Sequence, residues 1–296
     1  MQLSQLLARL LALVILLSPA LASADAPKFT RTQDLIYGRK YGTALTFDEF
    51  KPEKPNGRGV IFIVSGGWFS SHEAINPGFL SPVLDHGYTV FAVVHGSQPK
   101  FIIPECQQDL HRAVRFIRHN AKDYGIDPDH IGVYGASAGG HLTLSLVTQG
   151  GPGDSKAKDP VDRDSSAVQA AVAFFPPTDF LNYGKPGEDA VGVGILKDFK
   201  SAFGPAADTP ELRQSYGKLI SPIYHVHAGM APTLIIHGDA DKLVPIQQAQ
   251  LFIDKCKELN SPAKLITKPG KGHGWPDIGN DLKDVAEWFD QNLSAK

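Results

Sequence analysis

One short segment, Gly135-Ala136-Ser137-Ala138-Gly139, constrains this 296-residue chain more than any other. It follows the apolar run 130–134 and precedes the helix-like run 141–147. A serine at a sharp strand-to-helix turn sits at a strained backbone angle, and glycines on both sides leave room where side chains would collide. We predict that this turn holds the hydroxyl of Ser137 above the edge of a sheet as a nucleophile. The alternative is a glycine-rich turn that only packs tightly.

A serine nucleophile needs a base, and the base needs a carboxylate to orient it. His273 stands between two glycines in a loop that follows the last strand-like run of the chain. Asp239 and Asp241 directly follow another strand-like run, and Asp179 follows an earlier one. The carboxyl ends of parallel strands share one edge of a sheet, where ligands bind. We therefore predict that His273 and one of these three carboxylates meet Ser137 at that edge.

The charge that develops when a serine attacks a carbonyl must also be stabilised. Backbone N–H groups supply this in an oxyanion hole, and the residue after the nucleophile, here Ala138, provides one of them. The loop after an early strand provides the others. In this chain the β-branched run 60–64 is followed by Ser65-Gly66-Gly67-Trp68, and glycines allow close approach of backbone to substrate.

These motifs resemble those of the α/β-hydrolase superfamily, in particular the secreted feruloyl/acetylxylan-esterase-like and the hormone-sensitive-lipase-like families. The resemblance runs from about Val60 to about Phe289. The pattern His-Gly-x-x-Asp-x-x-Val-Pro at 237–245 identifies Asp241 as the acid of a Ser137–Asp241–His273 triad. Asp239 and Asp179 are the weaker alternatives.

By position, Gly66 and Gly67 match the family's oxyanion donors and join Ala138. The family motif begins His-Gly, and this chain departs from it with Val64 and Ser65. The family's histidine mainly braces the loop through hydrogen bonds, so we expect Ser65 to take over that role. Trp68 is interpreted as a packing residue or pocket wall, His141 as structural and His95 as a candidate pocket residue.

Alternating strand and helix patterns predict an α/β fold with a mostly parallel central sheet and helices on both faces. After an early β region at 43–47, strands are expected near 60–64, 88–94, 130–134, 168–175, 232–237 and 263–267. Helices are expected near 105–123, 138–148, 246–259 and 280–293. We interpret residues 25–296 as a single α/β-hydrolase domain, with a small polar cap-like insertion at about 180–224.

The first 24 residues have the pattern of a signal peptide. Arg9 precedes the apolar run 10–17, and small residues follow up to Ala24. Cleavage after Ala22 or Ala24 is equally compatible with the pattern. The apolar run is too short for a comfortable spanning helix, so no stable membrane span is expected after cleavage. The alternative is an uncleaved anchor. The sequence thus predicts a secreted or periplasmic protein.

Composition excludes some partners. The net charge is −2 and there is no basic stripe, which argues against nucleic acid. Cys106 and Cys256 are expected to be free, buried thiols, although an exported protein could pair them. No cofactor or metal is expected. The acidic loop at 150–164 could hold calcium, but a solvated loop is favoured.

Together, these features predict an exported serine carboxylic-ester hydrolase of the 3.1.1 class. The resemblance implies a short or aromatic acyl ester as substrate, small or linked to a polysaccharide. Two alternatives stay open: a serine peptidase resembling the catalytic domain of prolyl oligopeptidases, and a non-catalytic binding protein on the same fold. The oligomeric state is not predicted.

Overall fold

The computed structural model describes residues 29–293, and eight strands in this range form one sheet. The strand order is β1-β2-β4-β3-β5-β6-β7-β8. The first two pairs, β1–β2 and β2–β4, are antiparallel, and all later pairs are parallel. This is the mostly parallel sheet expected of an α/β hydrolase. The predicted signal peptide, 1–24, lies outside the described residues.

The five central strands are almost completely buried because helices cover both faces of the sheet. The strands are β1 (Phe29–Lys40), β2 (Thr43–Pro52), β3 (Gly59–Val64), β4 (Thr89–Val94), β5 (Ile131–Ala136), β6 (Ala170–Phe174), β7 (Thr233–Gly238) and β8 (Ala263–Lys268).

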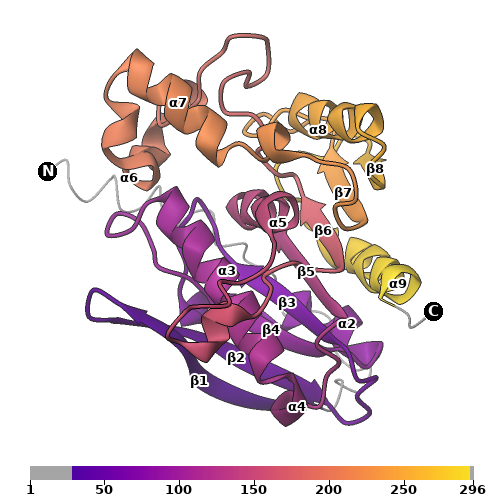
Figure 1. Cartoon of the computed structure of the whole chain (residues 1–296). Coiled ribbons are helices and arrows are strands. Elements are labelled where there is room, and N and C mark those ends of the chain that lie inside the picture. Colours follow the sequence, from indigo (N-terminus) through magenta and orange to yellow (C-terminus); the bar gives the residue numbers. More distant parts are fainter. Residues whose placement is uncertain (1–28, 294–296) are drawn as a thin grey trace, which may run out of the picture.

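The helices divide between the two faces, and each group closes its own hydrophobic cluster. α3, α5 and α8 supply one cluster, and α2 and α9 supply the other (Figure 1). The helices are α2 (Ser81–Asp85), α3 (Ile103–His119), α4 (Ala121–Tyr124), α5 (Ala138–Gln149), α6 (Lys200–Phe203), α7 (Pro210–Ile220), α8 (Gln247–Glu258) and α9 (Leu282–Asn292). The prediction of helices on both faces is confirmed.

The predicted strands are present, but the start of the sheet is longer than the sequence indicates. The β region expected at 43–47 is the long antiparallel pair β1–β2, joined at residues 41–42. β1 lies at the sheet edge and most of its residues are exposed or half-buried, so it lacks the apolar pattern that marks the inner strands.

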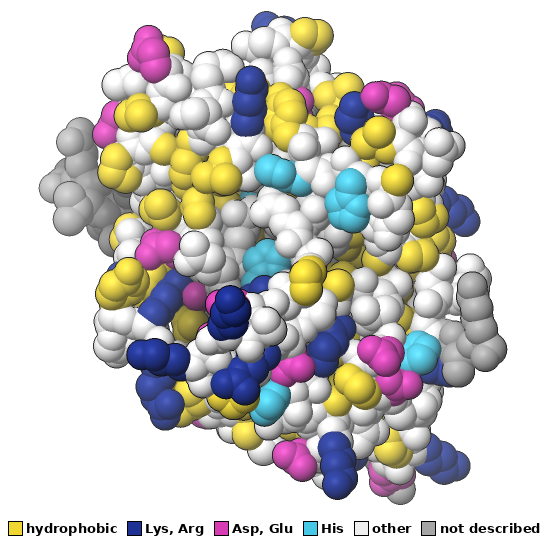
Figure 2. Space-filling model, viewed as in Figure 1, with side chains coloured by type: hydrophobic (Ala, Val, Ile, Leu, Met, Phe, Trp, Pro, Cys, Tyr) yellow, Lys and Arg dark blue, Asp and Glu magenta, His cyan; other side chains and the backbone are white. Residues whose placement is uncertain are grey.

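The insertion expected at 180–224 is helical. It contains α6, α7 and the short 3₁₀ turns η5 (Gly194–Phe199), η6 (Gly204–Ala207) and η7 (Pro222–His225). Figure 1 shows α6 and α7 together at one end of the molecule. The surface of the insertion is less polar than predicted: Figure 2 shows hydrophobic side chains gathered at the end of the molecule that holds α6 and α7. The exposed large hydrophobic residues of the insertion are Ile195, Leu212, Leu219 and, in η7, Tyr224.

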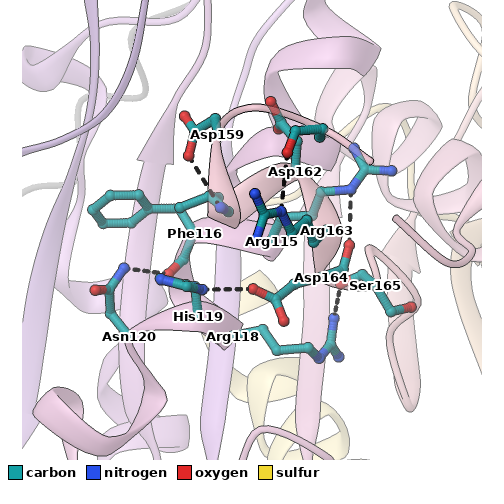
Figure 3. A network of polar contacts seen from close by, with 12 residues as sticks. Arg115, Phe116, Arg118, His119, Asn120, Asp159, Asp162, Arg163, Asp164 and Ser165 are labelled. Carbon is teal, nitrogen blue, oxygen red and sulfur yellow. Dashed lines mark hydrogen bonds and ion pairs between the residues drawn. The ribbon is translucent and has the colours of Figure 1, made fainter. Parts of the chain in front are cut away.

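The acidic loop at 150–164 is held by arginine and histidine side chains of α3. Arg112 pairs with Asp159 at 2.7 Å and with Asp162 at 2.8 Å. Figure 3 shows Asp164 accepting a hydrogen bond from His119, while Arg118 reaches the carbonyl of the neighbouring Ser165. Side chains of α3 therefore hold three of the four carboxylates in the loop that could have bound calcium, those of Asp159, Asp162 and Asp164.

Both cysteines are free and buried, Cys106 on α3 and Cys256 on α8, as expected. Within residues 29–293, no helix combines the length and the apolar character that crossing a membrane requires.

Candidate active site

The turn between β5 and α5 has the strained geometry predicted for Ser137. Its φ is 55° and its ψ is −118°, values that few non-glycine residues adopt. A Cβ on Gly135 would lie 2.6 Å from the carbonyl oxygen of Gly139, and one on Gly140 would lie 2.8 Å from that of Phe174. Glycine is thus required at both positions, because backbone carbonyl oxygens of the turn and of β6 lie too close for a side chain.

Loops that follow β7 and β8 bring Asp241 and His273 to Ser137. The distance from Ser137 Oγ to His273 Nε2 is 2.9 Å, and that from His273 Nδ1 to Asp241 Oδ2 is 2.8 Å. Gly238, at the end of β7, lets the two loops pass closely, since a Cβ there would lie 2.2 Å from the carbonyl oxygen of Lys271. The structure therefore joins the three predicted triad residues in one hydrogen-bonded row.

Asp241 is held in its ionised form, which can orient the imidazole of His273. Burial alone would raise the pKa of this carboxyl, but hydrogen bonds from His237 and His273 and from the Val244 amide hold the pKa well below its ordinary value. Its Oδ1 also accepts from the Leu243 and Val244 amides, each at 2.9 Å. An ionised Asp241 accepts a hydrogen bond from the Nδ1–H of His273, which leaves Nε2 free to accept the proton of Ser137.

The alternative carboxylates serve elsewhere. Asp239 accepts a hydrogen bond from the Gly270 amide at 2.6 Å, which steadies the loop that carries His273. Asp179 accepts from Asn182 and from the hydroxyl of Tyr224. Neither carboxylate is hydrogen-bonded to His273.

The loop after β3 is a two-residue hairpin. Gly66 and Phe69 exchange two backbone hydrogen bonds of 2.9 Å, and the central residues Gly67 and Trp68 have φ of 56° and 60°. Positive φ at both central positions is the signature of a type I′ turn. The loop therefore has a defined local geometry before any substrate arrives.

This geometry differs from the predicted set of oxyanion donors at one position. The N–H of Gly66 already donates to the carbonyl of Phe69, so Gly66 is not a free donor in this conformation. No hydrogen bond to another described residue uses the N–H groups of Gly67 and Ala138. The Ala138 amide lies at the start of α5, where the helix dipole also favours negative charge.

An aromatic cluster, which sequence reasoning missed, joins the hairpin to the insertion. The ring of Trp68 packs against Phe180, Phe199 and Phe203, with centroid distances of 5.3 to 6.1 Å. Trp68 Nε1 donates to Nδ1 of the fully buried His141 at 3.1 Å, and His141 Nε2 donates to the carbonyl at the end of α7 at 2.7 Å. The structural role predicted for His141 is thus to tie three segments together.

Phe175 is a second neighbour that the sequence did not reveal. It follows β6 with a φ of 35°, and its ring meets the His273 imidazole edge-on at a centroid distance of 4.7 Å. This contact helps to fix the plane of the imidazole.

Metal ligands are not part of this constellation. In the described part of the chain, one group of three possible ligands lies together: Asp34, Asp48 and His72. The guanidinium of Arg31 donates to Asp48 at 2.7 Å, which places a positive charge where a cation would bind. The group is an ion-pair cluster on the β1–β2 edge of the sheet.

Comparison with known proteins finds an ester hydrolase and esterases among the relatives of this chain. A family model, BD-FAE, matches residues 48–256. A probable carboxylic ester hydrolase, LipM of Mycobacterium tuberculosis, is 29% identical over 257 residues, which cover 83% of this chain and 57% of that protein. The chain spans 54% to 60% of the length of the three Mycobacterium tuberculosis relatives, LipM included.

Solved structures agree on the fold. A truncated carbohydrate esterase from gut microbiota superposes with a TM-score of 0.79, is 26% identical and covers 92% of this chain and 99% of its own. An acetyl ester-xyloside bifunctional hydrolase from Caldicellulosiruptor lactoaceticus superposes with a TM-score of 0.70, at 23% identity, covering 91% of this chain and 96% of its own. Both likenesses extend over nearly the whole described chain.

Buried histidines make the stability of this protein depend on pH. Burial lowers the pKa of His141 to about 4, and the pKa of His111 on α3 is lowered to about 4 by the same cause. The folded pKa lies below the unfolded one, so between pH 6.5 and 4 the unfolded chain binds the extra proton. We expect each histidine to reduce the free energy of unfolding by about 1.4 kcal/mol per pH unit as the pH falls through this window.

Chemical denaturation at pH 7 and pH 5 measures this effect. The variants His141→Gln and His111→Gln should each lose about 2 kcal/mol less than the wild type between these two pH values. The prediction is wrong if both variants keep the pH dependence of the wild type. Comparison of variant with wild type removes the contribution of the carboxyl groups, which all three proteins share.

Proposed function

This chain belongs to the BD-FAE family, and we propose that it hydrolyses carboxylic esters through an acyl-enzyme on Ser137. The observation that carries the proposal is the pair of distances, 2.9 Å and 2.8 Å, that links Ser137 to His273 and His273 to Asp241. The names of the relatives, which include ester hydrolases and esterases, support the same reaction class. The activity requires no cofactor.

In the proposed reaction, His273 Nε2 takes the proton of Ser137 as its Oγ attacks the ester carbonyl. The N–H groups of Gly67 and Ala138 stabilise the resulting oxyanion, and Asp241 stabilises the imidazolium. His273 then gives the proton to the departing alkoxide, which leaves an acyl-serine and a free alcohol. A water molecule, deprotonated by His273, attacks the acyl-serine. As the resulting tetrahedral intermediate collapses, His273 returns the proton to Ser137 Oγ, the acid is released and Ser137 is restored.

The proposed substrate is a short or aromatic acyl ester, carried by a saccharide. Support comes from the names of the two structural neighbours, a carbohydrate esterase and an acetyl ester-xyloside hydrolase. It also comes from the open rim of the site: Ser137 is only partly buried, Gly66 is exposed and the Phe69 side chain is 54% exposed. An exposed aromatic ring at the end of the hairpin that carries Gly67 suits the face of a sugar.

Removal of the nucleophile tests the reaction. Ser137→Ala should lower kcat for p-nitrophenyl acetate by at least about 10⁴-fold, because the nucleophile is lost. Asp241→Asn should lower kcat by about 10⁴-fold, because the imidazole of His273 loses the carboxylate that holds its correct tautomer. The matched control is Asp239→Asn, two residues away, which does not touch His273 and keeps an oxygen that accepts from the Gly270 amide; its kcat should stay within about threefold. Equal activity of wild type and Ser137→Ala would contradict the proposal.

Substrate choice is tested with a chain-length series and a polymer. Phe175 packs against the imidazole of His273, and Phe199 packs against Trp68 of the hairpin. We expect these two rings to limit the space for a long acyl chain. We expect kcat/KM for p-nitrophenyl acetate to exceed that for the octanoate by at least about tenfold, with release of acetate from acetylated xylan or of ferulate from its sugar esters. Preference for octanoate contradicts the substrate class. Cleavage of peptide amides alone favours the peptidase alternative, and inertness on all substrates favours the binding-protein alternative.

We also propose that the protein is exported, with residues 1–24 as its signal peptide. The support is the pattern of Arg9, the apolar run 10–17 and the small residues that follow. Mass spectrometry of protein recovered from an exporting host should find a first residue at 23 or 25. Recovery of chains that begin at Met1 would contradict the export proposal.

A further inference from the structure

The segment His95–Gln98, which directly follows β4, contacts the oxyanion hairpin at several points. His95 is 3% exposed, and its Nε2 lies 2.9 Å from the hydroxyl of Ser65, the residue before the hairpin. Its backbone N–H donates to the hydroxyl of Ser70, just after the hairpin. One buried histidine thus reaches the entry and the exit of the loop that holds the oxyanion donor Gly67.

The direction of each hydrogen bond follows from the partners of the imidazole. The carbonyl oxygen of Gly96 lies 2.8 Å from His95 Nδ1 and can only accept, so Nδ1 carries the proton. Nε2 is then an acceptor, and the Ser65 hydroxyl donates to it. Burial lowers the pKa of His95 to about 4, so this neutral form persists at neutral pH. His95 is thus fixed in the tautomer with the proton on Nδ1, and the hydrogen bond with Ser65 runs from the hydroxyl to Nε2.

Two further residues of the segment hold the hairpin itself. The side-chain amide of Gln98 donates to the carbonyl of Gly67 at 2.8 Å, and its backbone N–H donates to that of Trp68 at 3.3 Å. Ser97 Oγ accepts from the N–H of Ser70 and donates to its carbonyl, each at 2.6 Å. The bond to Gly67 fixes the peptide plane between the two central residues of the turn.

The segment is in turn anchored to the core. The amide of Gly96 donates to the buried carboxylate of Asp109 on α3 at 2.9 Å, and Lys40 pairs with that carboxylate at 2.7 Å. The thiol of Cys106 donates to the Gly96 carbonyl at 3.0 Å. A Cβ on Gly96 would lie 2.6 Å from the ring of Phe101, so only glycine allows this close packing. Contacts from β1 and α3 therefore determine where His95 stands.

From these contacts we infer that His95 and Gln98 are positioning residues of the oxyanion hole, which hold the Gly67 amide where the developing charge needs it. The inference rests on the proposed ester hydrolysis. Neither side chain has to touch the substrate: each acts through the hairpin. Losing a well-placed oxyanion donor lowers kcat by roughly 10²–10³-fold, because the donor acts in the transition state more than in the bound substrate.

The variant His95→Leu removes the acceptor of Ser65 and the donor to Gly96, and fills the space with an apolar side chain of similar size. We expect kcat for p-nitrophenyl acetate to fall by about 10²-fold while KM changes by less than about threefold. Affinity for a boronic acid, which forms a tetrahedral adduct on the serine, should fall in parallel. His95→Gln offers an amide oxygen near the position of Nε2 and should restore kcat to within about tenfold of wild type. Gln98→Leu should lower kcat by at least about tenfold.

A second serine–histidine pair provides the matched control. His111 Nδ1 lies 3.0 Å from the hydroxyl of Ser166 in the loop ahead of β6, at the opposite end of the strands from Ser137. His111→Leu removes a histidine contact of the same kind, so a loss of stability is allowed but kcat should stay within about threefold. Titration of the active serine with a fluorophosphonate corrects every rate for the folded fraction.

The outcomes separate two failures. If the wild type hydrolyses esters and His95→Leu and Gln98→Leu, corrected in this way, keep kcat within about threefold, the positioning role is wrong. It is also wrong if KM alone rises, since that would indicate loss of substrate binding and not of transition-state stabilisation. A wild type that is inert on every ester overturns the proposed function, and the positioning role with it.

Discussion

The backbone at Ser137 is the constraint around which the rest of the molecule is arranged. A positive φ at a non-glycine residue costs of order 1–3 kcal/mol and persists only where the surroundings over-determine it. Here the Ser137 amide donates to the Phe174 carbonyl and the His141 amide to the Ser137 carbonyl, each at 2.9 Å. Glycine on both sides of the turn lets β5, β6 and α5 approach closely enough to make these bonds. The strain is thus offset by packing between elements that the sheet must bring together in any case.

Much of the fold could be predicted from the sequence because the inner strands are short apolar runs between turn residues. The same reasoning misses β1, whose residues are largely exposed, and the helices of the 180–224 insertion, which bury an aromatic interior under a mixed surface. Those elements depend on contacts between distant segments, such as that of Trp68 with Phe203. Local patterns carry no record of such contacts.

The site divides in the same way. Motif spacing pointed to Ser137, to His273 and to one of three carboxylates, since the carboxyl ends of parallel strands must lie along one edge. The resemblance to known esterases then singled out Asp241. The N–H groups of the oxyanion hole were harder to predict. The pairing of Gly66 with Phe69 depends on a positive φ at Trp68, which no sequence pattern indicates. The contact of His95 with Ser65 joins residues 30 positions apart, each of which directly follows a strand, and explains how a loop without its own histidine is held. Sequence reasoning saw both residues but not their partnership.

The attachment of the insertion to His141 has a consequence for how such a protein can diverge. One face of the insertion is tied inward by Trp68 and His141, whereas Ile195, Leu212 and Leu219 on its outer face are exposed. We therefore expect substitutions of these exposed residues to leave the hydrogen bonds around Ser137 in place. New binding preferences can therefore evolve at these exposed positions. Substitutions at the contacts with Trp68 and His141 would instead disturb the hairpin and lower kcat.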